Sequence, residues 1–264
     1  MSNNALELGR IIFIPNMDIY GFNIRITDKV GVEVNILATL KKYRVNIIYA
    51  LISISPQNIS QKLGVFICNF TGLDVKPVNI LDEIKNIDGV IDAEIIQPIK
   101  KGFIIDDRHF PLFLGGVRTV VFRQFIVEGL LKRLREQYGS AFDIILYHQG
   151  FETGKVTYKY FKENYCLGSI EEFIKADTAI AKAVGWYELI IEKIDLKNRE
   201  AKVILKDSFE CVMFKDSKTP KSSFTRGFLA GLFTEIFRVK AQAYETKCIA
   251  IGDPYCEFQV KVEQ

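Results

Sequence analysis

The residues with the clearest chemical potential are Glu245, Cys248 and Cys256, which follow one another in a Glu-x-x-Cys-x7-Cys pattern. Gly252-Asp253-Pro254 lies between the two cysteines, and such a tripeptide interrupts regular structure and reverses the chain. Alternating residues on both sides predict a β-hairpin with a loop of about three residues. Two thiols and one carboxylate are therefore expected to converge, which supplies three of the four ligands of a zinc site.

Three chemical states of Cys248 and Cys256 fit this pattern. The pair can bind zinc together with Glu245 and a fourth ligand, which is either water or Cys211 from the end of a predicted strand. The pair can instead form a disulfide that closes the hairpin, or remain as free and inert thiols. The remaining cysteines are predicted to be ordinary core thiols: Cys68 and Cys166.

Composition limits the class of protein and its partners. A chain of 264 residues suits about two domains, and 48% hydrophobic with 25% charged residues is typical of a well-cored globular protein. A net charge of +3, from 35 basic and 32 acidic residues, argues against a general binder of nucleic acid or of a membrane surface. No apolar run approaches the ~20 residues that span a bilayer.

The N-terminal residues Met1–Glu7 contain neither the basic region nor the apolar stretch of a secretory signal, so the cytoplasm is the expected compartment. Thiols in that compartment are usually reduced. Abundant Ile, Lys and Glu, however, indicate a thermophilic, archaeal-like source, whose intracellular proteins can keep disulfides. The disulfide alternative at the hairpin therefore stays open.

Residues 10–100 are expected to form a first domain with the element order β-α-β-β-α-β. The predicted elements are a strand over Gly21–Ile26, a helix from a Thr27 or Asp28 cap to Tyr43, strands over Val45–Ile54 and Lys62–Phe70, a helix over Val78–Ile87 and a strand over Gly89–Gln97. This order is typical of a ferredoxin-like split βαβ unit.

Short motifs in this first part resemble an ACT domain. They are Asp28-x-x-Gly31 at the mouth of the first helix, Asn46-Ile47 at the start of the next strand, and Ile87-Asp88-Gly89-Val90. The resemblance implies that two copies pair side by side and that a ligand site lies at their interface near Gly31. In the alternative interpretation, Gly31 only permits a tight turn between strand and helix.

Residues 105–264 are expected to form a second domain after the polar break Lys100–His109. Hydrophobic periodicity predicts helices first and a sheet later. The predicted elements are helices over Arg118–Tyr138, Phe142–Gly154 and Ser169–Val184, a hairpin over Trp186–Leu205, and a helix over Phe224–Arg238 that starts at Ser222 or Ser223. The last helix carries a small-residue face formed by Gly227, Ala230 and Gly231, which should pack closely against a neighbour.

This order, with the terminal Glu245-Thr246-Lys247-Cys248 and Gly252–Phe258 segments, resembles the 4-vinyl-reductase (4VR) domain family over about residues 110–262. The family is similar to phenol-sensing domains of bacterial activators and to palmitate-holding, TRAPP-type vesicle-tethering subunits. The resemblance implies an α+β protein, in which a ferredoxin-like domain precedes a mixed α/β domain with helices packed on an antiparallel sheet. In the sensors, zinc is held by a cysteine, a glutamate and two further cysteines; the last three match Glu245, Cys248 and Cys256. The first falls at or beside Ser222, and a hydroxyl is a poor zinc ligand.

The same resemblance implies an apolar ligand site between the helices and the sheet, for an unknown small apolar or aromatic molecule. The candidate lining residues are aromatic side chains of this second part: Trp186, Tyr147, Phe151 and Phe161. Ordinary core packing is the alternative explanation for such aromatic residues.

No catalytic residue is predicted, because neither His109 nor His148 lies in a recognisable nucleophile setting and no phosphate-binding loop is present. The sequence therefore favours a non-enzyme. The leading hypothesis is a homodimeric small-molecule sensor or regulatory protein that acts through a separate, unidentified protein partner. The alternatives are a non-catalytic assembly, scaffold or carrier protein and an accessory subunit of a reductase.

Overall fold

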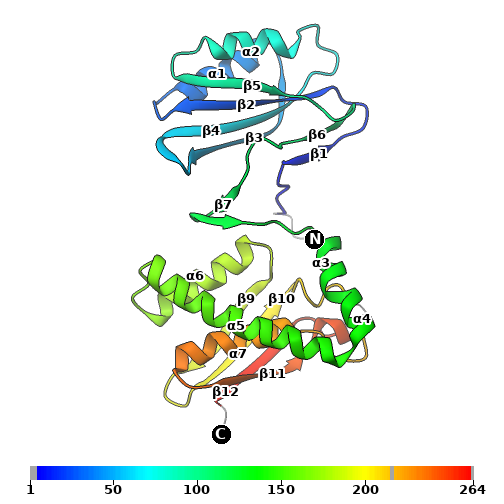
Figure 1. Ribbon diagram of the computed structural model, residues 1–264, viewed down its shortest axis with the longest axis vertical. Helices are drawn as coiled ribbons and strands as arrows, with labels where there is room; N and C mark the ends of the chain where they lie inside the picture. Colours follow the sequence, from blue (N-terminus) through cyan, green and yellow to red (C-terminus); the bar gives the residue numbers. More distant parts are fainter. Residues whose placement is uncertain (1–4, 215–216, 263–264) are drawn as a thin grey trace. The chain divides into compact units, whose positions relative to one another are not determined.

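The computed structural model describes residues 5–214 and 217–262, and it divides the chain into two compact units, Met1–Val120 (unit 1) and Val121–Gln264 (unit 2) (Figure 1). The division lies at Val120 rather than near residue 105. Two additional strand pairs extend the first unit: β1 (Ile11–Phe13) with β6 (Phe103–Ile105), and β7 (Leu112–Leu114) with β8 (Val117–Thr119). None of the described helices is long and apolar enough to cross a membrane.

Unit 1 is built on a four-stranded antiparallel sheet with the strand order β3-β4-β2-β5. Its elements in chain order are β2 (Ile19–Thr27), α1 (Val32–Lys42), β3 (Asn46–Ser55), β4 (Asn58–Asn69), α2 (Pro77–Lys85) and β5 (Val90–Ile96). Both helices bury their apolar residues against one face of the sheet. A smaller apolar cluster, to which β1 and β6 contribute, lies on the opposite face.

The start of α1 differs from the prediction. Its N-cap is Gly31, whose backbone has a φ of 94°, and no side chain caps the helix. Thr27 instead donates a hydrogen bond to the Gly89 carbonyl, and Asp28 pairs with Lys62. A Cβ at Gly31 would meet no neighbour within 4 Å, so the left-handed backbone is the feature that favours glycine here.

Unit 2 has a second antiparallel sheet with the order β11-β12-β10-β9 and a layer of helices on it. Its helices are α3 (Gln124–Val127), the π-helix η1 (Glu128–Arg133), α4 (Leu134–Tyr138), α5 (Ser140–Asn164), α6 (Ile170–Ala183), α7 (Ser223–Phe237) and the short 3-10 helix η2 (Ile249–Ile251). Its strands are β9 (Glu188–Asp195), β10 (Glu200–Lys206), β11 (Ala241–Lys247) and β12 (Cys256–Val262). The predicted mixture of helices and antiparallel sheets is thus confirmed.

Two of the predicted helices were wrong in extent. The first begins at Gln124 rather than Arg118, because Arg118 belongs to strand β8 and pairs with Phe113. The second does not end at Gly154 but continues to Asn164. The capping box predicted at the start of α6 is present, with Ser169 accepting from the Glu172 amide.

Glycines allow α5 and α7 to cross in backbone contact. A Cβ on Gly150 would lie 2.0 Å from the Phe224 carbonyl oxygen, and a Cβ on Gly231 would lie 1.9 Å from the Phe151 carbonyl oxygen. Gly154 and Gly227 face equally close backbone atoms. The small-residue face predicted on α7 is therefore confirmed, and the glycines of α5 are its counterpart.

Gly231→Ala is expected to lower the free energy of unfolding by about 3 kcal/mol, because the new methyl group would force two helix backbones apart. Alanine is intrinsically the better helix former by ~1 kcal/mol, so a loss can come only from the crossing. Urea denaturation measures it, with Gly129→Ala as the matched control, since a Cβ there meets nothing within 4 Å. Equal midpoints for the two variants would contradict the close packing.

Candidate metal centre

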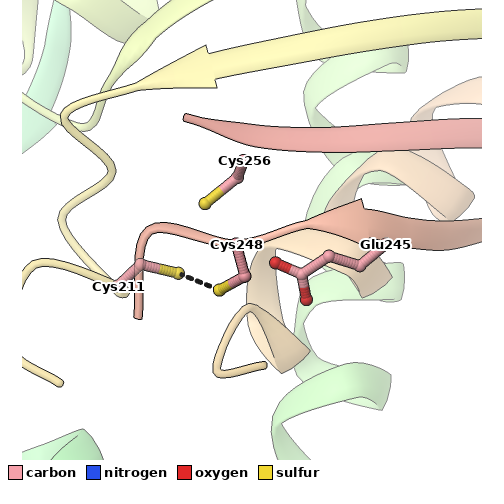
Figure 2. Close-up of side chains that lie close together, drawn as sticks. All are labelled: Cys211, Glu245, Cys248 and Cys256. Atoms are coloured by element: carbon pink, nitrogen blue, oxygen red, sulfur yellow. Dashed lines mark hydrogen bonds between the residues drawn. The ribbon is translucent and has the colours of Figure 1, made fainter. Parts of the chain in front are cut away.

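Four potential metal ligands converge in unit 2 from three places in the sequence (Figure 2). Glu245 lies on β11, Cys248 follows that strand, and Cys256 opens β12. Cys211 comes from the segment between β10 and α7. One ligand atom from each of these residues lies within 4.8 Å of the other three. The predicted convergence of the terminal hairpin is therefore observed, and Cys211 completes the set.

The dimensions of the cluster suit a tetrahedral ion. Four ligand atoms placed ~2.3 Å from a central zinc are about 3.8 Å apart. The Cys211 and Cys248 sulfur atoms are separated by 3.6 Å. All three cysteines of the cluster are fully buried. A set of three sulfurs and one carboxylate oxygen matches the ligand preference of zinc.

The thiols of the cluster are not joined by disulfides. Every cysteine in the described residues is free, and Cys248 and Cys256 are not bonded to each other. The structure thus shows the thiol state and not the disulfide alternative. Cys68 is buried as predicted for a core thiol, whereas Cys166 is exposed and is not.

The local fold holds the two terminal cysteines in place. The connection between β11 and β12 contains η2 and is longer than the predicted three-residue loop. The Asp253 carboxylate accepts a hydrogen bond from the Cys248 amide at 2.8 Å, and Gly252 takes a φ of 100°. The Ile249 amide points at the Cys256 sulfur at 3.4 Å. The Gly-Asp-Pro sequence thus fixes both sulfurs through backbone geometry.

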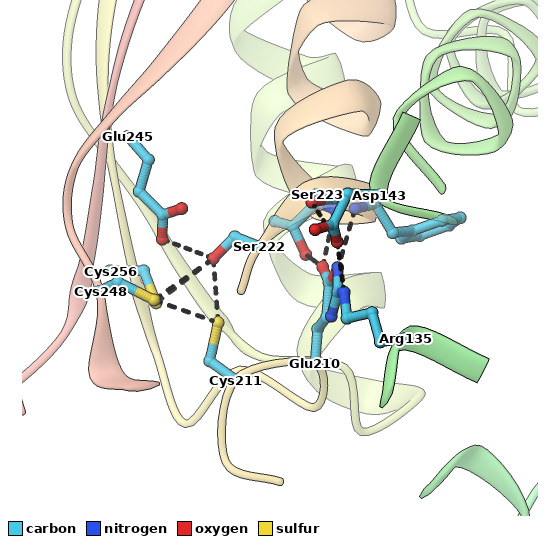
Figure 3. Close-up of polar contacts among 11 residues, drawn as sticks. Arg135, Asp143, Glu210, Cys211, Ser222, Ser223, Glu245, Cys248 and Cys256 are labelled. Carbon is cyan, nitrogen blue, oxygen red and sulfur yellow. Dashed lines mark hydrogen bonds and ion pairs between the residues drawn. The ribbon is translucent and has the colours of Figure 1, made fainter. Parts of the chain in front are cut away.

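Ser222, the N-cap residue of α7, places its hydroxyl inside the cluster (Figure 3). Its oxygen donates to Glu245 at 2.6 Å and lies 2.9 Å from the Cys211 sulfur. It is 3.8 Å from the Cys248 sulfur and 3.9 Å from the Cys256 sulfur. The hydroxyl is therefore a neighbour of all four ligands, while Cys211 supplies the third sulfur.

Burial and crowding set the protonation of the cluster. Burial raises the pKa of Glu245 to about 9, although the hydrogen bond from Ser222 acts in the opposite direction. Hydrogen bonds from Cys211 and Cys256 lower the pKa of Cys248, and the same contact with Cys248 raises the pKa of Cys211. The four groups therefore share one negative charge more readily than several. A divalent cation would compensate the charge that full deprotonation creates.

A second polar network, which the sequence did not predict, adjoins the cluster through Glu210. Glu210 is fully buried and accepts hydrogen bonds from the amides of Phe224 and Thr225, the Thr225 hydroxyl and the Arg135 guanidinium. Arg135 also pairs with Asp143, which accepts from Ser223. The residue before Cys211 therefore ties the metal-ligand segment to α4 and to the start of α7.

The aromatic residues predicted to line a ligand site lie at different places in unit 2. Trp186 packs edge-on or tilted against three phenylalanines of the core: Phe209, Phe224 and Phe228. Phe161 contacts Phe173. Tyr147 stacks near Phe151 and lines a surface cavity of about 550 Å³, which also includes His148 and Arg226.

A buried carboxyl group on α6 gives unit 2 a pH-dependent stability. Asp177 is 5% exposed, and burial raises its pKa from 3.8 to about 7. Because the folded state retains a proton that the unfolded chain releases, stability is complete below about pH 4 and is lost as the pH rises through about 7.

The free energy of unfolding is therefore expected to fall by roughly 3–4 kcal/mol between about pH 4 and pH 8, and Asp177→Asn should remove this decrease. Urea titrations of both proteins across this range measure the difference between them. Parallel pH profiles would contradict the assignment to Asp177.

The comparisons with known proteins converge on unit 2. A domain of the vinyl-4-reductase (4VR) family is matched over residues 202–262. The uncharacterized protein MJ0150 of Methanocaldococcus jannaschii is 34% identical over 177 residues, which cover 66% of this chain and 94% of that protein. The phenol-responsive sensory domain of the transcription activator PoxR, solved with phenol, has a TM-score of 0.51 at 18% identity and covers 57% of this chain and 79% of its own. A vinyl-4-reductase family protein from M. jannaschii has a TM-score of 0.39 at 25% identity, covering 56% of this chain and 85% of its own.

Proposed function

The chain belongs to the family of the M. jannaschii protein MJ0150 and carries a 4VR domain, and on that premise we propose that it is a zinc-containing small-molecule sensor or regulatory protein. The observation that supports the zinc is the convergence of Cys211, Glu245, Cys248 and Cys256. All four positions around the ion would be filled by protein side chains, which is typical of a structural site. The ion would link β11 and β12 to the segment before α7.

The proposed ligand is a small apolar or aromatic molecule bound by unit 2. Its support is the fold shared with a domain solved with phenol. Trp186 is the first candidate for a ligand contact, followed by Tyr147, Phe151 and Phe161. A phenol would suit such a site, because aromatic walls bind its ring and few polar groups are needed for its hydroxyl.

Fluorescence tests the ligand proposal directly, because Trp186 is the single tryptophan of the chain. Titration of the zinc-loaded protein with phenol should change the Trp186 emission in a saturable way, whereas cyclohexane-saturated buffer without phenol should not. Native mass spectrometry of freshly purified protein provides a second measurement. A chain that carries zinc but neither retains an organic ligand nor responds to phenol would favour the scaffold alternative.

We further propose that unit 1 is an ACT-like, ferredoxin-like domain and that the protein is a homodimer acting through a separate protein partner. The element order β2-α1-β3-β4-α2-β5 supports the domain assignment. Strand β3 is an edge of its sheet and carries the exposed Leu51 and Ile54, which supports pairing. Unit 2 also exposes apolar side chains around α3 and η1: Val121, Phe122, Phe125, Ile126 and Leu130.

Light scattering tests the dimer. The expected result is a single species of twice the chain mass at tens of micromolar, since exposed apolar surface of this kind is usually covered by a second copy. A monomer throughout that concentration range would contradict the proposal. Gly31 is the residue at which a ligand of unit 1 would be sought first.

A further inference from the structure

Unit 1 contains a cavity of about 500 Å³ that none of the proposals above uses. It lies on the face of the sheet opposite α1 and α2. Ile24 and Ile26 of β2 point into the core beneath the helices, so the alternate residues Asn23 and Arg25 face the other side, where they line the cavity. Residues 106–113 close it from the side away from the sheet.

The segment that closes the cavity is held by a buried ion-pair network. Asp106 is 5% exposed and pairs with Arg10 at 3.4 Å and with the Nδ1 atom of His109 at 2.9 Å. Arg10 also donates hydrogen bonds to the carbonyl oxygens of Asp106 and His109. With Nδ1 occupied by Asp106, Nε2 is the ring atom of His109 that remains for a ligand, since His109 also lines the cavity.

Arg25 is the one arginine of the cavity whose charge is not already used. Among the described residues, its guanidinium has no hydrogen-bond or ion-pair partner. Arg10 serves Asp106, and Arg108 pairs with Glu94 at 3.5 Å and with Asp107 at 3.4 Å.

The remaining walls combine amides with apolar side chains. Asp92 is the carboxylate opposite Arg25 on β5, and it forms no ion pair with Arg25 in the described part of the chain. The amides that line the cavity are Asn23, Gln57, Asn58 and Gln61, and the apolar side chains include Leu51, Ile54, Leu63, Phe110, Leu112 and Phe113.

We propose that this cavity binds a small organic carboxylate with an apolar body, and that Arg25 holds the carboxylate. The planar guanidinium matches the two oxygens of a carboxylate, and an unpaired one can bind them without first breaking another ion pair. The volume falls in the range of small-molecule sites, and the apolar walls leave room for more than an inorganic anion. The site is separate from Gly31 and from the metal centre of unit 2.

Fluorine NMR of the full-length protein with 4-fluorophenylacetate tests the proposal. The wild-type protein should bind this acid, and Arg25→Gln should weaken its affinity by at least about tenfold through loss of the charged hydrogen bonds. Arg44→Gln, which changes an exposed arginine outside the cavity, should leave the affinity unchanged. Asp92→Asn should strengthen binding by about twofold or more, because it removes the nearest unpaired negative charge.

Two further outcomes separate this site from others. The neutral 4-fluorophenylacetamide should bind at least about tenfold more weakly than the acid. Probe bound in unit 2 would be insensitive to Arg25→Gln. An affinity that is equal for wild type and Arg25→Gln, or equal for acid and amide, would overturn the proposal.

Discussion

Cys211→Ser is expected to weaken zinc binding at least about a hundredfold, although Cys211 lies outside the Glu-x-x-Cys-x7-Cys pattern. The reason is geometric, because its sulfur is 3.6 Å from that of Cys248 and its ligand atom belongs to the group within 4.8 Å. A hydroxyl binds zinc far more weakly than a thiolate does. The wild-type chain should retain one zinc ion against a chromophoric chelator that strips the variant.

Loss of the ion should also lower the stability of unit 2. Binding of structural zinc contributes apparent free energies of ~10–16 kcal/mol in small zinc-dependent domains, and the part that exceeds apo-state folding appears as thermal stability. Chelation of the wild type and the Cys211→Ser substitution are therefore expected to lower the melting temperature by similar amounts. Zinc added back should restore the wild type and leave the variant unchanged.

Ser222 provides a rescue that a non-specific loss of folding would not show. Its oxygen already lies near all four ligands, so the double variant Cys211→Ser, Ser222→Cys should recover zinc binding by supplying the third sulfur from the other side. Cys166→Ser, at an exposed position, is the matched control and should behave as wild type. Undiminished zinc affinity in Cys211→Ser alone would remove Cys211 from the ligand set.

The terminal hairpin was predictable because its ligands are close in sequence and the turn between them has a strong local signal. Cys248 and Cys256 are separated by a Gly-Asp-Pro turn, and β11 pairs with β12 as the alternation indicates. Cys211 was reached only as one of two candidates for the fourth ligand, since nothing in its own neighbourhood marks it as a ligand. The capping box of α6 is predictable for the same reason as the hairpin: both of its partners lie within three residues.

Features that depend on distant partners were not predictable from local patterns. The pairing of Ile11 with Ile105 joins strands of three residues, which are too short for a periodicity signal. Helix α5 passes through Gly150 and Gly154 because α7 supplies the packing that offsets their poor helix propensity. Arg135 reads as one more charged residue on an amphipathic helix. Its burial follows from Glu210, which lies far along the chain.

Arg135→Met is expected to lower the free energy of unfolding by about 3–5 kcal/mol, the second largest effect after loss of the ion. The substitution removes one partner of a buried ion pair whose atoms are 2.9 Å apart, and it leaves the fully buried Glu210 without its counter-charge. Because Glu210 precedes Cys211 and also binds the first amides of α7, the metal-ligand segment should be loosened. Zinc affinity is therefore expected to fall together with stability.

A matched surface pair supplies the control for this effect. Lys159 and Glu235 form an ion pair at 3.4 Å with the lysine 56% exposed, so Lys159→Met should cost less than ~1 kcal/mol. Arg135→Met with Glu210→Gln removes both charges and should regain part of the stability lost in the single variant, because no unpaired charge remains buried. Chemical denaturation of the three variants compares these costs. If Arg135→Met costs no more than Lys159→Met, the ion pair does not hold the metal-ligand segment, and the stability of that segment must come from the ion and the packing of Cys211 alone.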